Sequence, residues 1–235
     1  MSIIIHGKNA VREALKSGRT IHELYVLEKQ HFDFLDKKIL DAIPTRFLSK
    51  NEIHKKLPTG HQGIGAKVDS YHSLKLTDVL KKRGKKLFVM LDSIEDPHNL
   101  GAVLRSADAF AVTGVIVPKH RSVSINSTVV KVSTGAIEYV KIIEVTNLNQ
   151  AIKTLKEHDV WIVGTDANTK HNLDYIQADL DLCVVFGSEG KGLHRLVKEN
   201  CDYLVKIPMV GHVNSLNVSV SCGIVLHDIM RRRKT

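Results

Sequence analysis

Hydrophobic and polar positions follow two patterns along the chain. In the first 70 residues, short apolar runs alternate with amphipathic stretches, which predicts a compact α/β unit. Ser49 and Glu52 have the spacing of a capping box, and the helix that they open is expected to end at Pro58. We expect the other elements of this part at residues 8–16 and 33–42 (helices) and 21–27, 45–48 and 64–68 (strands).

From residue 87 onward, short β-branched runs are separated by stretches with helical spacing. Because the runs are apolar throughout, they predict a mainly parallel sheet covered by helices on both faces, an α/β fold. Ligands of such sheets bind at the carboxyl ends of the strands, so the following loops are the places to look for a site. The predicted strands are residues 87–92, 114–118, 161–165, 182–187 and 203–208.

The polar, basic segment between these two parts is expected to be a linker. We therefore predict an N-terminal domain at residues 1–70, a basic linker at 71–85 and a C-terminal domain at 86–235. The chain has 34 basic and 25 acidic side chains, a net charge of +9, and the excess lies before residue 87. A basic front part on a neutral body favours a polyanion such as nucleic acid as partner, although a solvated basic surface has the same composition.

Composition argues against several other classes of protein. No stretch has the roughly 20 uncharged apolar residues of a membrane span, and the N-terminus does not resemble a signal peptide. The three cysteines are far apart, which predicts a cytosolic protein without a disulfide framework. Neither H-E-x-x-H nor C-x-x-C occurs, so we expect no metal.

The first loop of interest is DPHNLGAVLRSADAF, which starts at Asp96 and follows the strand at 87–92. Pro97 and Gly101 indicate a turn into a helix that Asn99 is placed to cap, with Arg105 further along. Taken alone, Asn99 can be only a cap and Arg105 only a surface charge.

The second loop is FGSEGKGLHRL, residues 186–196. Its three glycines allow close approach of the backbone to a ligand. Gly187, Gly190 and Gly192 do not have the G-x-G-x-x-G spacing, and no Ser or Thr follows Lys191 as in a Walker A loop.

The third loop, residues 207–217, leads into a long helix rich in small residues. Ser215 or Asn217 can serve as its N-cap, which is a purely structural role.

Taken together, the three loops identify a protein family far more specifically than any one loop does. NLGAVLR from Asn99, FGSEGKG from Phe186, IPM from Ile207 and SLNVS from Ser215 resemble, in order and spacing, the three motifs of the SpoU (TrmH-like) ribose methyltransferases of the SPOUT superfamily. HGKNAV from His6 and HQGI from His61 resemble the bacterial subgroup that methylates a guanosine in the peptidyl-transferase region of 23S, large-subunit ribosomal RNA.

This resemblance implies a fold, a cofactor and partners. The front part is expected to be an RNA-binding domain similar to a ribosomal-protein fold. The rest is expected to be an α/β-knot domain with a trefoil knot, which is rare among proteins in general, and to form a homodimer. The implied reaction is methyl transfer from S-adenosyl-L-methionine to the ribose 2′-hydroxyl of a guanosine in large-subunit rRNA.

The resemblance also implies roles for particular residues. The candidate catalytic residues are Arg105, Asn99, Glu189, Ser215 and Asn217. The candidate cofactor-binding residues are Gly187, Ile207, Leu216 and Thr165. A guanidinium hardly deprotonates, so we expect Arg105 to bind the phosphate beside the target ribose and stabilise the developing alkoxide, with Glu189 orienting Arg105 or Asn99.

Three alternatives remain at this point. The substrate can be transfer RNA instead of ribosomal RNA, and the chain can be a non-catalytic RNA-binding homologue. A dinucleotide-dependent oxidoreductase on a doubly wound sheet is disfavoured by the glycine spacing.

Overall fold

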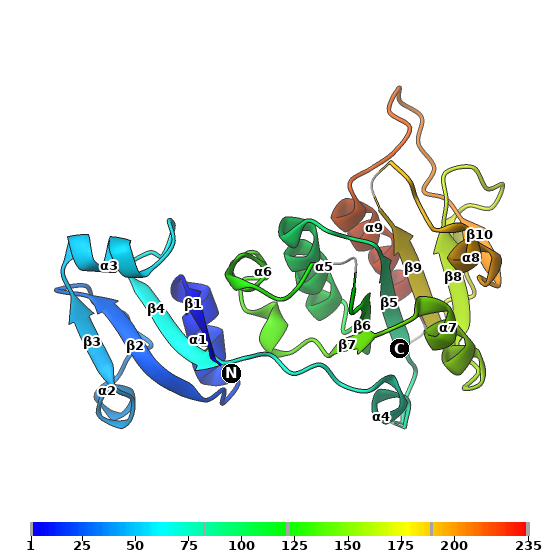
Figure 1. Cartoon of the computed structure of the whole chain (residues 1–235). Helices are drawn as coiled ribbons and strands as arrows, with labels where there is room; N and C mark the ends of the chain where they lie inside the picture. Colours follow the sequence, from blue (N-terminus) through cyan, green and yellow to red (C-terminus); the bar gives the residue numbers. More distant parts are fainter. Residues whose placement is uncertain (1, 82, 121–122, 189, 234–235) are drawn as a thin grey trace. The chain divides into compact units, whose positions relative to one another are not determined.

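The chain forms two compact units, which we describe separately. A computed structural model describes residues 2–81, 83–120, 123–188 and 190–233. Unit 1 contains residues 1–71 together with 125–139, and unit 2 contains residues 72–124 and 140–235 (Figure 1). None of the described helices is long and apolar enough to cross a membrane.

Unit 1 is built on a four-stranded sheet with the order β1-β4-β2-β3. Strand β4 runs antiparallel to both of its neighbours, and β2 and β3 are parallel. The strands are β1 (Ser2–His6), β2 (Ile21–Leu27), β3 (Thr45–Leu48) and β4 (Ile64–Asp69). The helices are α1 (Lys8–Lys16), α2 (Lys37–Ala42), α3 (Lys50–Lys56), α6 (Ser127–Val132) and the short 3₁₀ helix η1 (Ala136–Glu138).

Local sequence explains where two helices of unit 1 begin. The predicted capping box is present, with Ser49 and Glu52 each bonding the other's backbone N–H, and α3 ends at Lys56. Helix α2 is shorter than predicted because Asp36 accepts a hydrogen bond from the Ile39 N–H and caps the helix there. Strand β1 was not predicted.

Residues 125–139 contribute to unit 1, although the sequence assigns them to the C-terminal domain. Val129 and Val130 of α6 are fully buried. Glu138 of η1 forms an ion pair with Arg19, with Nη1 and Oε2 2.9 Å apart, and accepts a hydrogen bond from the hydroxyl of Tyr71. Unit 1 is therefore assembled from two separate stretches of chain.

Unit 2 is built on a six-stranded sheet with the order β10-β8-β9-β5-β6-β7, and all pairs are parallel. Its strands are β5 (Leu87–Asp92), β6 (Gly114–Pro118), β7 (Ile142–Val145), β8 (Trp161–Thr165), β9 (Leu182–Gly187) and β10 (Tyr203–Val205). Its helices are α4 (Leu76–Leu80), α5 (Pro97–Ala109), α7 (Leu148–Lys156), α8 (Arg195–Glu199), α9 (Val218–Arg232) and the 3₁₀ helix η2 (Leu173–Tyr175).

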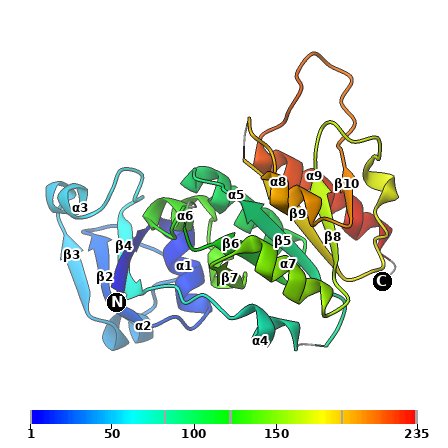
Figure 2. The ribbon, with the colours of Figure 1, turned by 45° about the vertical axis from the view of Figure 1, so that its right-hand side comes forward.

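Helices cover both faces of this sheet, as predicted. Phe88 and Met90 of β5 belong to an apolar cluster with side chains of α4, α7 and α8. The opposite face is covered by α5 and α9, which pack against each other and contact β6 and β9 (Figures 1 and 2). Side chains along a strand point alternately to the two faces of the sheet. Because helices cover both faces, every residue of the LFVML run is buried.

Several short elements of unit 2 were not predicted, among them the 3₁₀ helix η2. Strand β7 is only four residues long, and α4 lies within the segment assigned to the linker. Strand β10 ends at Val205, three residues before the predicted end.

Candidate active site

The three motif loops begin at the same edge of the sheet in unit 2. Strands β10, β8, β9 and β5 are consecutive neighbours and parallel, so their carboxyl ends meet there. Asp92, Gly187 and Thr165 end three of these strands, and the loop that contains Ile207 follows the fourth.

The first motif lies on α5, but Asn99 does not cap it. Asp96 is the N-cap, and its Oδ1 accepts a hydrogen bond of 2.8 Å from the His98 N–H. Pro97 occupies the first turn, where its missing N–H costs nothing. Asn99 therefore lies inside the first turn, half-buried, and Arg105 is exposed two turns further along.

The first and third motifs are joined by a direct hydrogen bond. Asn217 Nδ2 donates to Asn99 Oδ1 over 2.8 Å. Asn217 also caps α9, since its Oδ1 accepts from the Ser219 N–H (2.9 Å). Each asparagine lies at the start of its helix, and the two helices, α5 and α9, pack together. The two side-chain amides are therefore held at the sheet edge. Ser215 precedes this cap and is exposed.

The second motif forms a tight turn directly after β9. Ser188 and Gly192 exchange two backbone hydrogen bonds, of 3.2 and 2.9 Å. A Cβ atom on Gly187 would lie 2.1 Å from the carbonyl carbon of Gly192, so only glycine fits there. Gly190 and Gly192 have positive φ angles of 84° and 66°. Glu189 lies outside the described residues.

Three further predicted positions lie at the end of β8 and in the third loop. The Thr165 hydroxyl donates to the Val185 carbonyl over 3.0 Å, which links β8 to β9. Asp166 follows it; burial opposes its ionisation, but hydrogen bonds from Lys198 and the Asn168 N–H outweigh burial and hold the Asp166 pKa below its ordinary value. Ile207 and Leu216 are half-buried in the third loop.

Sequence reasoning missed one polar pair at this edge. Asp92, the last residue of β5, is 2% exposed, and its carboxylate accepts a hydrogen bond from the His194 backbone N–H over 2.8 Å. The His194 Nδ1 lies 2.9 Å from the other oxygen. An acidic residue that ends an entirely apolar strand was the available signal for Asp92.

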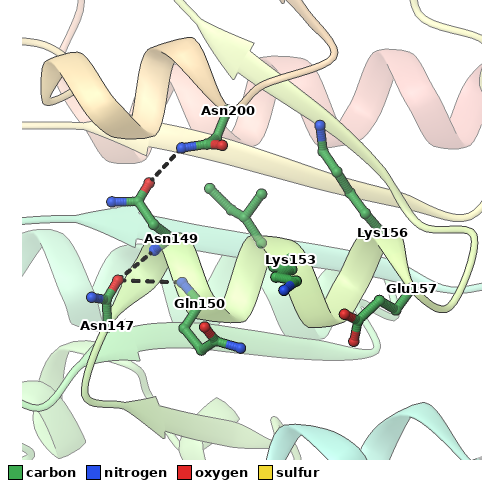
Figure 3. A pocket seen from close by; sticks show the side chains of 8 residues that line it. Asn147, Asn149, Gln150, Lys153, Lys156, Glu157 and Asn200 are labelled. Atoms are coloured by element: carbon green, nitrogen blue, oxygen red, sulfur yellow. Dashed lines mark hydrogen bonds between the residues drawn. The ribbon is translucent and has the colours of Figure 1, made fainter.

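A concave surface lies along α7, away from the three motifs in sequence (Figure 3). Its amides serve the local fold: Asn147 caps α7, and Asn200 Nδ2 donates to Asn149 Oδ1 over 3.1 Å. Lys156 is paired with Asp202. The residues that line this surface, none of them in the three motifs, are Asn147, Asn149, Gln150, Ile152, Lys153, Lys156, Glu157 and Asn200. Among the described residues, no group of three or more His, Cys, Asp or Glu side chains is placed to hold a metal ion.

Known proteins match both parts of the chain. Residues 86–227 match the SpoU rRNA methylase family, and residues 4–74 match the family described as RNA 2′-O ribose methyltransferase substrate binding. A protein of Staphylococcus haemolyticus assigned to the TrmH family of tRNA/rRNA methyltransferases is 41% identical, over 98% of this chain and 96% of its own length. The similarly assigned YacO of Bacillus subtilis is 40% identical, over 97% and 94%.

A solved structure has the same fold over nearly the whole chain. It is that of the SpoU methyltransferase AviRb from Streptomyces viridochromogenes in complex with AdoMet, with a TM-score of 0.85 and 21% identity, covering 98% of this chain and 90% of that one. The sequence matches span far more than half of the chain. The chain therefore belongs to the SpoU (TrmH-like) family of SPOUT RNA methyltransferases.

Proposed function

We propose that this protein transfers a methyl group from S-adenosyl-L-methionine to a ribose 2′-hydroxyl of RNA, and that its substrate is a guanosine of 23S, large-subunit rRNA. The observation that carries the proposal is that the three motif loops begin at one edge of the sheet, where the hydrogen bond between Asn99 and Asn217 joins the first and third motifs. The methyl donor bound to the related AviRb protein supports the choice of cofactor. The subgroup assignment rests on the N-terminal sequence pattern.

The residues at this edge fit an adenosine-containing cofactor. Gly190 and Gly192 have open space where a Cβ atom would lie, so the backbone of the turn is accessible to a ligand there. We assign the cofactor to Gly187, Ile207, Leu216 and Thr165. When bound, S-adenosyl-L-methionine supplies an activated methyl group, which leaves alignment and charge stabilisation to the protein.

The protein's contribution to the reaction is positioning and a positive field. Holding the ribose 2′-hydroxyl in line with the methyl group of the cofactor lowers the barrier by about 7–11 kcal/mol. Arg105, exposed on α5, binds the phosphate next to the target ribose and stabilises the developing alkoxide. Ser215 and Asn217 position the ribose or the cofactor by hydrogen bonds, and Asn99 fixes the first loop. Glu189 orients Arg105 or Asn99.

Methyl transfer from labelled S-adenosyl-L-methionine tests this assignment directly. Unmodified large-subunit rRNA and transfer RNA are offered side by side to the wild type, Arg105→Ala and Arg105→Glu. We expect label on one rRNA ribose, at least about 100-fold slower labelling by both variants, and unchanged cofactor affinity. Full turnover by Arg105→Glu refutes the role of Arg105, and label on transfer RNA alone overturns the substrate. Cofactor binding without label on either RNA favours the non-catalytic alternative.

RNA affinity is expected to depend on the basic residues of unit 1. Deleting residues 1–84 is a poor test, because α6 and η1 would lose the rest of their unit. Lys8→Ala and Lys50→Ala remove exposed charges instead. Removing one lysine that binds a phosphate flattens the slope of log K against log salt by about 0.7–0.9. Lys153→Ala, on α7 of unit 2, is the matched control, and equal slopes in all variants would contradict the assignment.

We also infer that the protein is a homodimer whose C-terminal segment forms a trefoil knot. The dimer is supported by apolar side chains exposed one turn apart on α9, Val220 (48%) and Ile224 (38%). Sedimentation velocity tests it: wild type at twice the monomer mass and Ile224→Asp at the monomer mass are expected. A monomeric wild type rejects the dimer.

A further inference from the structure

The buried carboxylate of Asp92 has no place in the chemistry described above. It ends β5 in the middle of the sheet, with its side chain 3% exposed. A carboxylate in such a place is stable only if hydrogen-bond donors surround it. Ser93 Oγ, 3.4 Å away, contributes weakly, whereas His194 approaches both carboxylate oxygens closely.

His194 binds Asp92 at two points. Its backbone N–H donates to Oδ2 over 2.8 Å, and its Nδ1 lies 2.9 Å from Oδ1. The ring itself is largely open to solvent, with 57% of the side chain exposed, so hydrophobic burial does not explain its orientation. The carboxylate therefore fixes both the backbone and the side chain of a residue that closely follows the glycine turn.

Asp92 holds the glycine turn at both of its ends. At one end, its backbone is the register partner of Gly187 across the β5–β9 pair. At the other end, its side chain binds His194. Between them, Ser188 and Gly192 close on each other through their backbone bonds. Asp92 thus lies beside the residue that starts the turn and binds a residue that follows its end.

We propose that Asp92 and His194 are positioning residues that hold the glycine turn in the shape that binds S-adenosyl-L-methionine. The inference rests on the proposed function, which assigns the cofactor to this turn. A turn fixed before the ligand arrives loses less conformational entropy on binding, so releasing its end weakens affinity. Neither side chain is required to touch the cofactor.

The test compares cofactor affinity in full-length variants by titration calorimetry. His194→Ala keeps the backbone hydrogen bond and removes the ring, so we expect an affinity for S-adenosyl-L-methionine about tenfold weaker, in line with the loss of one hydrogen bond to a charged group. His194→Asn places an amide N–H near the position of Nδ1 and is expected to restore most of that loss. His158→Ala, which alters an exposed histidine beyond α7, is the matched control and is expected to bind as the wild type does.

Hydrogen exchange at the Ser188 and Gly192 amides separates positioning from general stability. We expect the cofactor to protect both amides in the wild type. In the free His194→Ala protein, we expect exchange of these two amides to be accelerated by a larger factor than that of the β5 amides, which report any general loss of stability. Absence of protection in the wild type, despite binding, places the cofactor elsewhere and refutes the proposed site. Protection in the wild type together with wild-type affinity in His194→Ala refutes only the positioning role. An affinity of His194→Asn as weak as that of His194→Ala also overturns it.

Discussion

Replacing Glu138 by alanine is expected to destabilise unit 1 strongly. Its side chain is 3% exposed and accepts hydrogen bonds from Arg19 (2.9 Å), Ser17 (3.3 Å) and Tyr71. Arg19 is itself only 12% exposed and stacks 3.4 Å from the centre of the Tyr71 ring. Burial, and then the charge of Glu138, raise the pKa of Tyr71, so this hydroxyl stays a donor. Removing the carboxylate leaves a buried guanidinium without its counter-ion.

The size of the effect follows from the surroundings of Arg19. Breaking a buried ion pair by removing one partner costs about 3–5 kcal/mol. Arg19 keeps two hydrogen bonds to the Asp69 carbonyl, of 2.7 and 3.2 Å, which favours the lower end of that range. We therefore expect a loss of about 3 kcal/mol, which is an opening of unit 1 roughly 150-fold more frequent. Glu138→Gln keeps an acceptor and is expected to lose less.

Hydrogen exchange measures the opening of each unit separately. A single unfolding curve of a chain with two units does not separate their stabilities. Amides of α1 and β4 report on unit 1, and amides of β5 and β9 report on unit 2. Glu199→Ala is the matched control, because its pair with Arg195 is exposed (53% and 77%) and is worth at most about 1 kcal/mol. If Glu138→Ala changes the protection of unit 1 by no more than Glu199→Ala changes that of unit 2, the reasoning about the buried pair is wrong.

Three further outcomes are expected. Burial, together with the charge of Lys131, lowers the pKa of His6 below its ordinary 6.5. The unfolded chain then takes up the proton more readily than the folded chain, so the free energy of unfolding is highest above pH 6.5 and decreases as the pH falls below it. Melting curves recorded from pH 7.5 to 5.5 check this, and the decrease in melting temperature is expected to be smaller in His6→Gln. Burial raises the pKa of Cys201 to about 12 and also raises the pKa values of Cys183 and Cys222. Alkylation of the three thiols at pH 8 is therefore expected to be slow until guanidinium chloride unfolds the protein. Gly187→Ala is expected to abolish cofactor binding in calorimetry, since its Cβ meets the backbone of Gly192, and wild-type affinity would contradict the close approach.

The strands were predictable where burial is complete and the segment is long enough. LFVML and LCVVF are apolar on both faces, as central parallel strands require, and both were located correctly. Strand β7 has four residues, of which Glu144 is exposed, so its pattern resembles that of a loop. The assignment of 125–139 to unit 1 was beyond sequence reasoning, because its partners are far away along the chain: Tyr71 is 67 residues from Glu138, and Arg19 is 119 residues from it.

The site was predictable as a set of motifs and much less as a geometry. Spacing brought Asn99, Arg105 and Asn217 to attention, but not the hydrogen bond that joins two of them across 118 residues. The capping role given to Asn99 was wrong because Asp96 and Pro97 form a stronger start signal. Asp92 had a local signal, as an acidic residue at the end of an apolar strand, but its pairing with His194, 102 residues away, had none. The roles given to the motif residues in catalysis and cofactor binding stay predictions.

The split composition of unit 1 has a consequence for synthesis on the ribosome. Its sheet is encoded before residue 71, but α6 and η1, which complete its packing, end only at residue 138. At about 5–20 residues per second, the intervening stretch takes roughly 3–14 s to translate. During that time the nascent sheet lacks α6, which contacts β1 and buries Val129 and Val130 in the finished unit. We expect this interval, more than any step in the finished chain, to be when the protein relies on chaperones.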